Sequence, residues 1–245
     1  MHHHTRWAAL AMLLALGTAC AEQASDDFKL EPGYTLLFNG KDLTGWKYMP
    51  TPKENLDGKT ETADKRFYVV EGAIVAAEKD KDGKGGIKDL YTVQDFDKDF
   101  NLKLEFRAGE KADSGVYLRG QQLQVRDYIR RGEQKQLTKY KNDGWNLLDI
   151  TVKGGVVSTS VNGKAVTDKD ELELTVKNGK PQAKLNGQAV EVAKVEVAVG
   201  GEATPLLNGE ALTPPTLKIP SKGGIGVQAE TGKFEFRRIR VKELK

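Results

Sequence analysis

Apolar and polar residues alternate along many short stretches of this chain, with the period of half-buried β-strands. The clearest stretch is 100–108 (FNLKLEFRA), where Leu102, Leu104 and Phe106 share one face and the residues between them are polar. Glycine, asparagine and aspartate separate these stretches, and none of them repeats apolar residues with a sustained helical spacing. The pattern predicts an all-β fold, either a sandwich or a jelly roll.

The stretch 112–128 (ADSGVYLRGQQLQVRDY) reads as two strands whose apolar parity changes at Gly120. Val116 and Leu118 occupy even positions, whereas Leu123 and Val125 occupy odd ones, so a turn or bulge is expected between them. If the apolar residues face a partner sheet, the polar ones share the outer face. That outer set is Tyr117, Arg119, Gln122, Gln124 and Arg126, with Glu105 and Arg107 on the outer face of the preceding strand.

Two interpretations of this polar face are open. It is a solvated surface with cross-strand ion pairs, or it is the floor of a binding site. Tyr117 among glutamines and arginines offers a flat apolar ring beside planar hydrogen-bonding groups, which suits a sugar. Trp145 precedes the strand of Leu148 and Ile150 with the opposite parity. It either stacks on a sugar ring or packs at the rim of the sandwich.

An internal repeat with an offset of 24 residues joins 148–166 (LDITVKGGVVSTSVNGKAV) to 172–190 (LELTVKNGKPQAKLNGQAV). A weaker third copy ends at Asn208-Gly209. Each copy is predicted to run strand, glycine turn, strand, Asn-Gly turn, and Asn-Gly favours the type I′ turn of tight hairpins. The copies form a meander that extends the sheets, or they form a separate interaction module.

Residues 1–20 have the features of a secretory signal peptide, with a basic start, an apolar run and small residues before Cys20. Thr18-Ala19-Cys20 resembles a bacterial lipobox, although Gly17 stands where leucine is usual. Lipidation of Cys20 would anchor the protein to a membrane, whereas cleavage after Ala21 would release it. We therefore expect an exported protein of the periplasm or cell envelope, with 21–27 as a polar linker.

The composition excludes several kinds of chemistry. All three histidines and the single cysteine lie in residues 1–20, so an exported mature chain has no Ser-His-Asp triad, no Cys-His pair and no zinc site of His and Cys. We predict no metal and no cofactor. The net charge is +3 and no basic stripe carries interleaved aromatic residues, so a nucleic acid partner is not expected.

The stretch 78–89 (EKDKDGKGGIKD) partly matches a calcium-binding loop. Acidic residues alternate at Glu78, Asp80 and Asp82, Gly83 follows, and Asp89 stands at the position of the final ligand. Gly85 replaces the usual apolar residue and the flanking patterns are strands. A charged hairpin loop therefore fits the stretch better.

Several stretches together resemble the bacterial 3-keto-disaccharide hydrolase domain family, formerly a domain of unknown function. They are YTLLFNGKDLTGW from Tyr34, FNLKLEFR followed by DSGVYLRG and LQVRD, GWNLLDITVKGG with VNGKAV, and the ending GGIGVQAETGKFEFRRIRVKEL. The resemblance covers 28–166 and 223–244. It implies a concanavalin A-like jelly-roll sandwich over 28–245, interrupted by an insertion of repeated hairpins at 168–222.

The resemblance also implies an exported protein that acts on a carbohydrate, with its sugar site on the concave sheet. The family commonly carries Glu-x-Gln-x-x-Asp, and the matching residues are Gln122, Gln124 and Asp127. Gln122 therefore stands where the family has glutamate, and a glutamine cannot ionise. If that glutamate is essential in the family, this chain binds its sugar without cleaving it.

A 3-keto sugar needs only one base, because its carbonyl acidifies the hydrogen on C2 and lets the group on C1 leave. Glu105 and Asp127 are the candidate bases. Arg107 or Arg119 would stabilise the enolate, while Tyr117, Gln122, Gln124 and Trp145 would bind the substrate. Three hypotheses follow: an enzyme that cleaves 3-keto-disaccharides or 3-keto-glycosides, a lectin-like module of the cell envelope, and a structural envelope protein whose hairpins contact other proteins.

Overall fold

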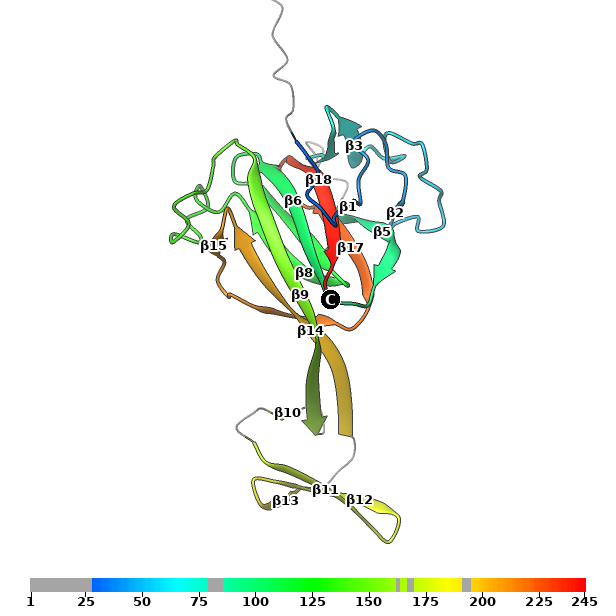
Figure 1. Cartoon of the computed structure of the whole chain (residues 1–245), viewed down its shortest axis with the longest axis vertical. Coiled ribbons are helices and arrows are strands. Elements are labelled where there is room, and N and C mark those ends of the chain that lie inside the picture. The colour runs from blue at the N-terminus through cyan, green and yellow to red at the C-terminus, as the bar shows by residue number, and fades with distance from the viewer. Residues whose placement is uncertain (1–27, 79–85, 162–163, 167–169, 191–194) are drawn as a thin grey trace, which may run out of the picture.

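The computed structural model describes residues 28–78, 86–161, 164–166, 170–190 and 195–245, and Figure 1 shows strands and connecting turns throughout. The prediction of an all-β fold is confirmed. The described part of the chain offers no membrane-spanning helix. Residues 1–27, with the predicted signal peptide, the predicted linker and Cys20, lie outside the described ranges, as do residues 79–85 of the calcium-loop candidate.

Two antiparallel sheets pack face to face as a sandwich. The larger sheet has ten strands: β1 (Thr35–Leu36), β3 (Phe67–Val70), β4 (Ala73–Ala76), β6 (Phe100–Ala108), β9 (Asn146–Val161), β10 (Lys164–Val166), β14 (Val195–Leu207), β15 (Glu210–Ala211), β16 (Leu217–Pro220) and β18 (Phe234–Glu243). The smaller sheet has five strands in the order β2 (Trp46–Tyr48), β5 (Lys88–Phe96), β17 (Gly223–Ala229), β7 (Asp113–Leu118) and β8 (Gln121–Arg126).

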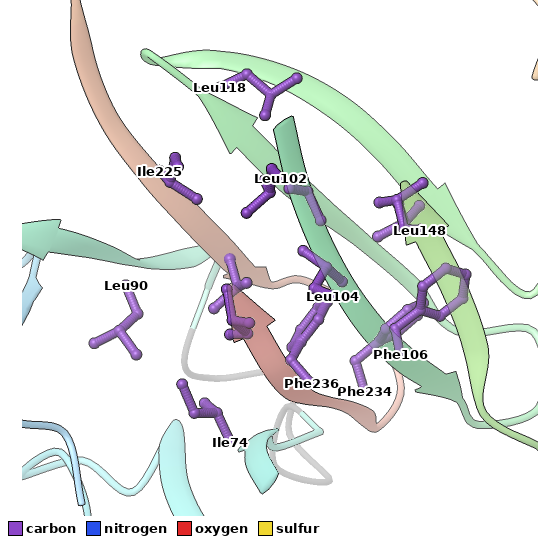
Figure 2. Close-up of a cluster of buried hydrophobic side chains, with 14 of the residues drawn as sticks. Ile74, Leu90, Leu102, Leu104, Phe106, Leu118, Leu148, Ile225, Phe234 and Phe236 are labelled. Carbon is purple, nitrogen blue, oxygen red and sulfur yellow. The ribbon is translucent and has the colours of Figure 1, made fainter. Parts of the chain in front are cut away.

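The core lies between the two sheets and follows the predicted alternation. Leu102, Leu104 and Phe106 of β6 are fully buried, and the residues between them are half-buried on the outer face. Figure 2 shows these side chains with Phe236 of β18 and Ile225 of β17, which come from the two sheets. Burial of such side chains contributes about 1.5–3 kcal/mol each, so the sandwich is held chiefly by this layer.

The two last strands of the chain lie inside the sheets. Strand β17 lies between β5 and β7 in the five-stranded sheet, and β18 lies between β4 and β6 in the ten-stranded sheet. Each sheet is therefore assembled around a C-terminal strand. The segment GGIGVQAE–FEFRRIRV, which contributes to the family resemblance, thus pairs with β1, β4, β5, β6 and β7.

The repeated segments form two different structures. In the second copy, β11 (Leu172–Lys177), β12 (Lys180–Leu185) and β13 (Gln188–Val190) form a separate three-stranded sheet. In the first copy, β9 continues through Gly154-Gly155 without a turn. The glycine turn predicted there is wrong, because β14 pairs with β9 on both sides of Gly154-Gly155. The pairing only shifts its register there, between Gly200 and Gly201 of β14.

Strands β9 and β14 extend beyond the sandwich, and the three-stranded sheet lies at their far end (Figure 1). The Asn-Gly pairs at 178–179, 186–187 and 208–209 all have positive φ at both residues, the conformation expected of type I′ turns. The segment 168–222, predicted to be an insertion, also contributes strands to the ten-stranded sheet, since β14 pairs with β9 and β16 pairs with β14. It is therefore continuous with the sandwich.

Candidate functional site

The outer face of the five-stranded sheet carries most of the predicted sugar-binding residues. Strands β7 and β8 form a hairpin in which Tyr117 pairs with Gln122 and Gly115 pairs with Gln124. A two-residue turn of Arg119 and Gly120, both with positive φ, joins them. This turn explains the parity change at Gly120, and Tyr117, Gln122 and Gln124 lie opposite the buried Val116, Leu118 and Val125.

Glycines at outer positions make room for two of these side chains. A Cβ at Gly115 would overlap the side-chain amide of Gln122. A Cβ at Gly226 would come within 3.0 Å of the Tyr91 ring. Glycine inside a strand often marks a close approach of another group, and here Tyr91 and Gln122 lie against the bare backbone of β17 and β7.

A hydrogen-bond network joins four strands across this face. Gln122 Nε2 donates to Gln228 Oε1 (2.8 Å). Gln228 Nε2 donates to Tyr117 Oη (2.5 Å) and to Asp89 Oδ1 (3.3 Å). The rings of Tyr91 and Tyr117 are 5.0 Å apart between centroids. We call this surface, formed by Asp89, Tyr91, Tyr117, Gln122, Gln124 and Gln228, the amide face.

Burial is the main cause that raises the pKa of Tyr117 above its ordinary value, and the negative charge of Asp89 raises it further. Burial likewise raises the pKa of Tyr91. Both phenols therefore stay protonated at neutral pH, and each keeps an O–H donor. The amide face accordingly offers amide and phenol donors beside the carboxylate of Asp89, and Tyr117 and Asp89 are both half-buried and so open to solvent.

A second group of polar residues adjoins the amide face. Gln124 Nε2 donates to the Asp113 carboxylate and to Glu230 Oε2 (3.4 Å). Arg126 donates to Asp113 Oδ1 (3.0 Å) and to both carboxylate oxygens of Glu133. Arg131 also pairs with Asp113 and Glu133, so two cations meet two anions and this edge of the face is close to neutral.

Arg119 and Asp127 do not lie on the amide face. Arg119 belongs to the β7–β8 turn and is almost fully buried. Its guanidinium donates to the carbonyl oxygens of Lys98 (2.6 Å) and Pro220 (3.4 Å). The Asp127 carboxylate is fully buried and accepts from the Lys111 amide (2.7 Å) and from Arg130 Nε (2.5 Å). These contacts hold loops in place.

Glu105, Arg107 and Trp145 lie on the opposite side of the sandwich, because β6 belongs to the ten-stranded sheet. Glu105 accepts from Arg237 Nε (2.9 Å) and from Arg238 (2.7 Å), while Arg107 pairs with Glu235. The guanidiniums of Arg107 and Arg237 lie over the Trp145 ring, 4.8 and 4.1 Å from its centroid. We call this surface, formed by Glu105, Arg107, Trp145, Glu235 and Arg237, the ion-pair face; it shares no groove with the amide face.

Asp89, Tyr91 and Gln228 belong to the amide face but are absent from the site predicted from sequence. Their signal lies in GGIGVQAE, where Gly224, Gly226 and Gln228 occupy alternate positions of one strand. Small residues alternating within a strand indicate a surface on which other groups lie. Asp89 itself is in β5, where it pairs in register with Gln228. The described residues contain no group of three or more His, Cys, Asp or Glu side chains able to hold a metal.

A β-sandwich whose exposed sheet face combines tyrosines, amides and a carboxylate has the composition of a sugar-binding domain. The family model for 3-keto-α-glucoside-1,2-lyase-like domains matches residues 33–242, so the chain belongs to this family. This confirms the family resemblance of the sequence motifs. Membership indicates a domain that acts on glycosides or binds carbohydrate.

Solved structures similar to this chain include two of a "putative glycosyl hydrolase" from Parabacteroides distasonis. One has 20% sequence identity, covers 87% of this chain and 94% of its own, and has a TM-score of 0.44. The other has 16% identity, coverages of 86% and 99%, and the same TM-score. A carbohydrate-binding module from Bacillus subtilis has 9% identity, coverages of 86% and 96%, and a TM-score of 0.29. None of the curated proteins matches the chain.

Proposed function

We propose that the chain cleaves 3-keto-glycosides on the amide face, by elimination across C1 and C2 of the sugar. The observation that carries the proposal is the network in which Gln228 contacts the half-buried Asp89 and is itself bonded to Gln122 and Tyr117. A 3-keto group makes the C2 hydrogen acidic, so one well-placed carboxylate is a sufficient base. Family membership supports a reaction of this kind.

In the proposed reaction, Asp89 takes the proton from C2 and the electron pair passes to the carbonyl oxygen on C3 as an enolate. The enolate then re-forms the carbonyl, a C1–C2 double bond forms, and the C1–oxygen bond breaks. The leaving oxygen takes a proton from the Tyr117 phenol or the solvent. Phenol and amide donors of the face would stabilise the enolate oxygen. Water added to C1 would turn the elimination into a hydrolysis.

The proposed base, Asp89, differs from Glu105 and Asp127, the two candidates proposed on sequence grounds. Glu105 already accepts from two arginines on the ion-pair face. Asp127 is fully buried and is held by Arg130 and by a backbone amide. Asp89 is the carboxylate that combines exposure with contacts to Gln228 on the amide face. Tyr117, Gln122 and Gln124 keep the substrate-binding role proposed for them, whereas Arg107, Arg119 and Trp145 do not.

The test is incubation of the purified chain with a 3-keto-α-glucoside, followed by measurement of the released sugar and of the absorbance of the enone product. Release that depends on Asp89 is the expected result. If the wild-type chain releases nothing from any 3-keto-α- or 3-keto-β-glycoside tried, the enzymatic proposal is wrong.

The second candidate function is carbohydrate binding without turnover. The observation that favours it is the pair of half-buried amides on β8, because Gln122 and Gln124 can hydrogen-bond a sugar but cannot transfer protons as acids do. Binding of the 3-keto-glycoside with unchanged substrate after prolonged incubation would select this function.

We also propose that the chain is exported and anchored through a lipid on Cys20. The signal-peptide pattern of residues 1–20 and the Thr18-Ala19-Cys20 sequence support this proposal. In a bacterial host, mass spectrometry of the mature N-terminus should show a lipidated cysteine, and Cys20→Ala should move the protein from the membrane to the soluble fraction. A mature chain that begins after Ala21 would contradict the anchor but not the export.

A further inference from the structure

A pocket of about 350 Å³ lies along the free edge of β8, next to the amide face. Gln122 and Gln124 contribute to both, so the pocket and the face are continuous. Its volume falls within the range of small-molecule sites, roughly 300–1,000 Å³. We call it the edge pocket.

One wall of the edge pocket belongs to the insertion. Leu212, Thr213 and Pro214, between β15 and β16, and Leu217 at the start of β16 line it. The Gln134 side chain holds this segment with two hydrogen bonds to the backbone of Thr213, at 2.7 Å to its carbonyl oxygen and 3.0 Å from its amide. The wall therefore has a defined position, because a paired amide contact restrains it in two directions.

The two sides of the edge pocket differ in chemistry. The insertion side is mainly aliphatic, with Leu212, Pro214 and Leu217 beside Thr213, and the β8 side is mainly polar, with Gln122, Gln124 and Arg126 beside Leu123. A hexose ring has the matching character, with an apolar face of C–H groups and a rim of hydroxyls. Because Asp113 and Glu133 balance the charge of Arg126, the pocket favours a neutral ring over a phosphorylated or acidic one.

We propose that the edge pocket binds the leaving-group unit of the substrate, a second neutral hexose, and that the insertion thereby makes the chain selective for disaccharides. The inference rests on the proposed function, in which the 3-keto sugar lies on the amide face. Two sugar rings joined by one glycosidic bond would then lie across β7 and β8. The bond to be broken would lie near the junction of face and pocket.

The experiment fills the pocket and compares two substrates. Leu217→Trp places a large ring in the pocket, and Lys218→Trp is the matched control, because Lys218 is the next residue of β16 and its exposed side chain does not line the pocket. For a 3-keto-disaccharide, we expect KM to rise at least about tenfold in Leu217→Trp and less than about twofold in Lys218→Trp. For the methyl 3-keto-glucoside, both variants should stay within about twofold of wild type.

Equal effects of Leu217→Trp on the two substrates, or no effect on either, would overturn the proposal. Thr213→Trp provides a second filled pocket if Leu217→Trp does not fold, since the Thr213 side chain is exposed and lines the same wall. Its expected result is the same selective rise in KM for the disaccharide.

Binding measurements separate a failure of this inference from a failure of the proposed function. If the wild-type chain releases no sugar, calorimetry with the unreacted 3-keto-disaccharide and with methyl 3-keto-glucoside tests the pocket alone. The disaccharide should bind at least about tenfold more tightly, and Leu217→Trp should abolish that difference. Equal affinities in the wild type would overturn the pocket even if the amide face binds sugar.

Discussion

On the ion-pair face, Glu105 contacts Arg237 and Arg238, and Glu235 contacts Arg107 and Lys233, so each acid is shared by two cations. On the amide face, Gln228 connects Gln122, Tyr117 and the carboxylate of Asp89, and no cation takes part in these bonds. Cations bound to an acid take up its acceptor oxygens. Amides leave part of their hydrogen-bonding capacity for a ligand. The contrast shows that polar side chains on an outer face are not enough to identify a site; their partners decide it.

The sharpest test of this contrast removes one carboxylate from each face. Asp89→Asn should lower kcat for a 3-keto-α-glucoside by about 10²–10⁴-fold, the usual contribution of a general base. Glu105→Gln should change kcat by less than about twofold. Comparable losses in the two variants, at equal folded fractions by circular dichroism, would mean that the faces do not differ in this way.

The second largest effect is expected at Gly115, where the missing side chain leaves room for Gln122. Gly115→Ala pushes the Gln122 amide out of its place, so we expect sugar affinity to fall about tenfold by calorimetry, the equivalent of losing about one good hydrogen bond. The double variant Gly115→Ala/Gln122→Ala removes the overlap and should regain melting temperature without regaining affinity. Full affinity in Gly115→Ala would show that the position of Gln122 is unimportant.

On the ion-pair face the expected change is in stability. Glu105→Gln keeps one acceptor oxygen but loses the charge that pairs with Arg237 and Arg238, which should cost about 1–2 kcal/mol of unfolding free energy. Urea denaturation measures this directly, and Arg237→Gln should show a similar loss. An unchanged midpoint in both variants would indicate that these pairs contribute nothing to the fold.

The smallest expected effect concerns acid stability of the N-terminal segment that packs on the ten-stranded sheet. A hydrogen bond from Arg240 holds the pKa of Glu31 at about 2, below its ordinary 4.5. A lowered pKa contributes stability above pH 4.5 that is lost as the pH falls toward 2. The melting temperatures of wild type and Glu31→Gln should therefore converge between pH 5 and 2. A constant difference over that interval would contradict the assignment.

The alternation of residues was sufficient to predict the core side of β6, β7 and β8. Leu102, Leu104 and Phe106 are buried as the pattern indicates, and Tyr117 and Gln122 face outward. The sequence did not predict which strands pair with each other, because pairing joins residues that are far apart in the sequence. Strand β6 pairs with β9 and β18, not with β7, and this places Glu105 and Tyr117 on opposite sides of the sandwich.

Three further residues were not placed correctly from the sequence, Arg119 for a local reason and Asp89 and Gln228 because their contact is long-range. Arg119 shares the parity of the outer face, yet the positive φ of the turn and the carbonyl partners at Lys98 and Pro220 draw its side chain inward. Gln228 and Asp89 are 139 residues apart, so their contact depends on β17 lying beside β5. The contacts made by the motifs in β17 and β18 depend on the order of strands in the two sheets.

The central positions of β17 and β18 also bear on how the molecule is made. Neither sheet can close before Gly223–Ala229 and Phe234–Glu243 have been synthesised, because each of these strands separates two others. Such long-range pairing slows folding and leaves earlier strands exposed in the meantime. The nascent chain would therefore remain open until both strands have been made, and loss of β18 alone should leave it unable to fold.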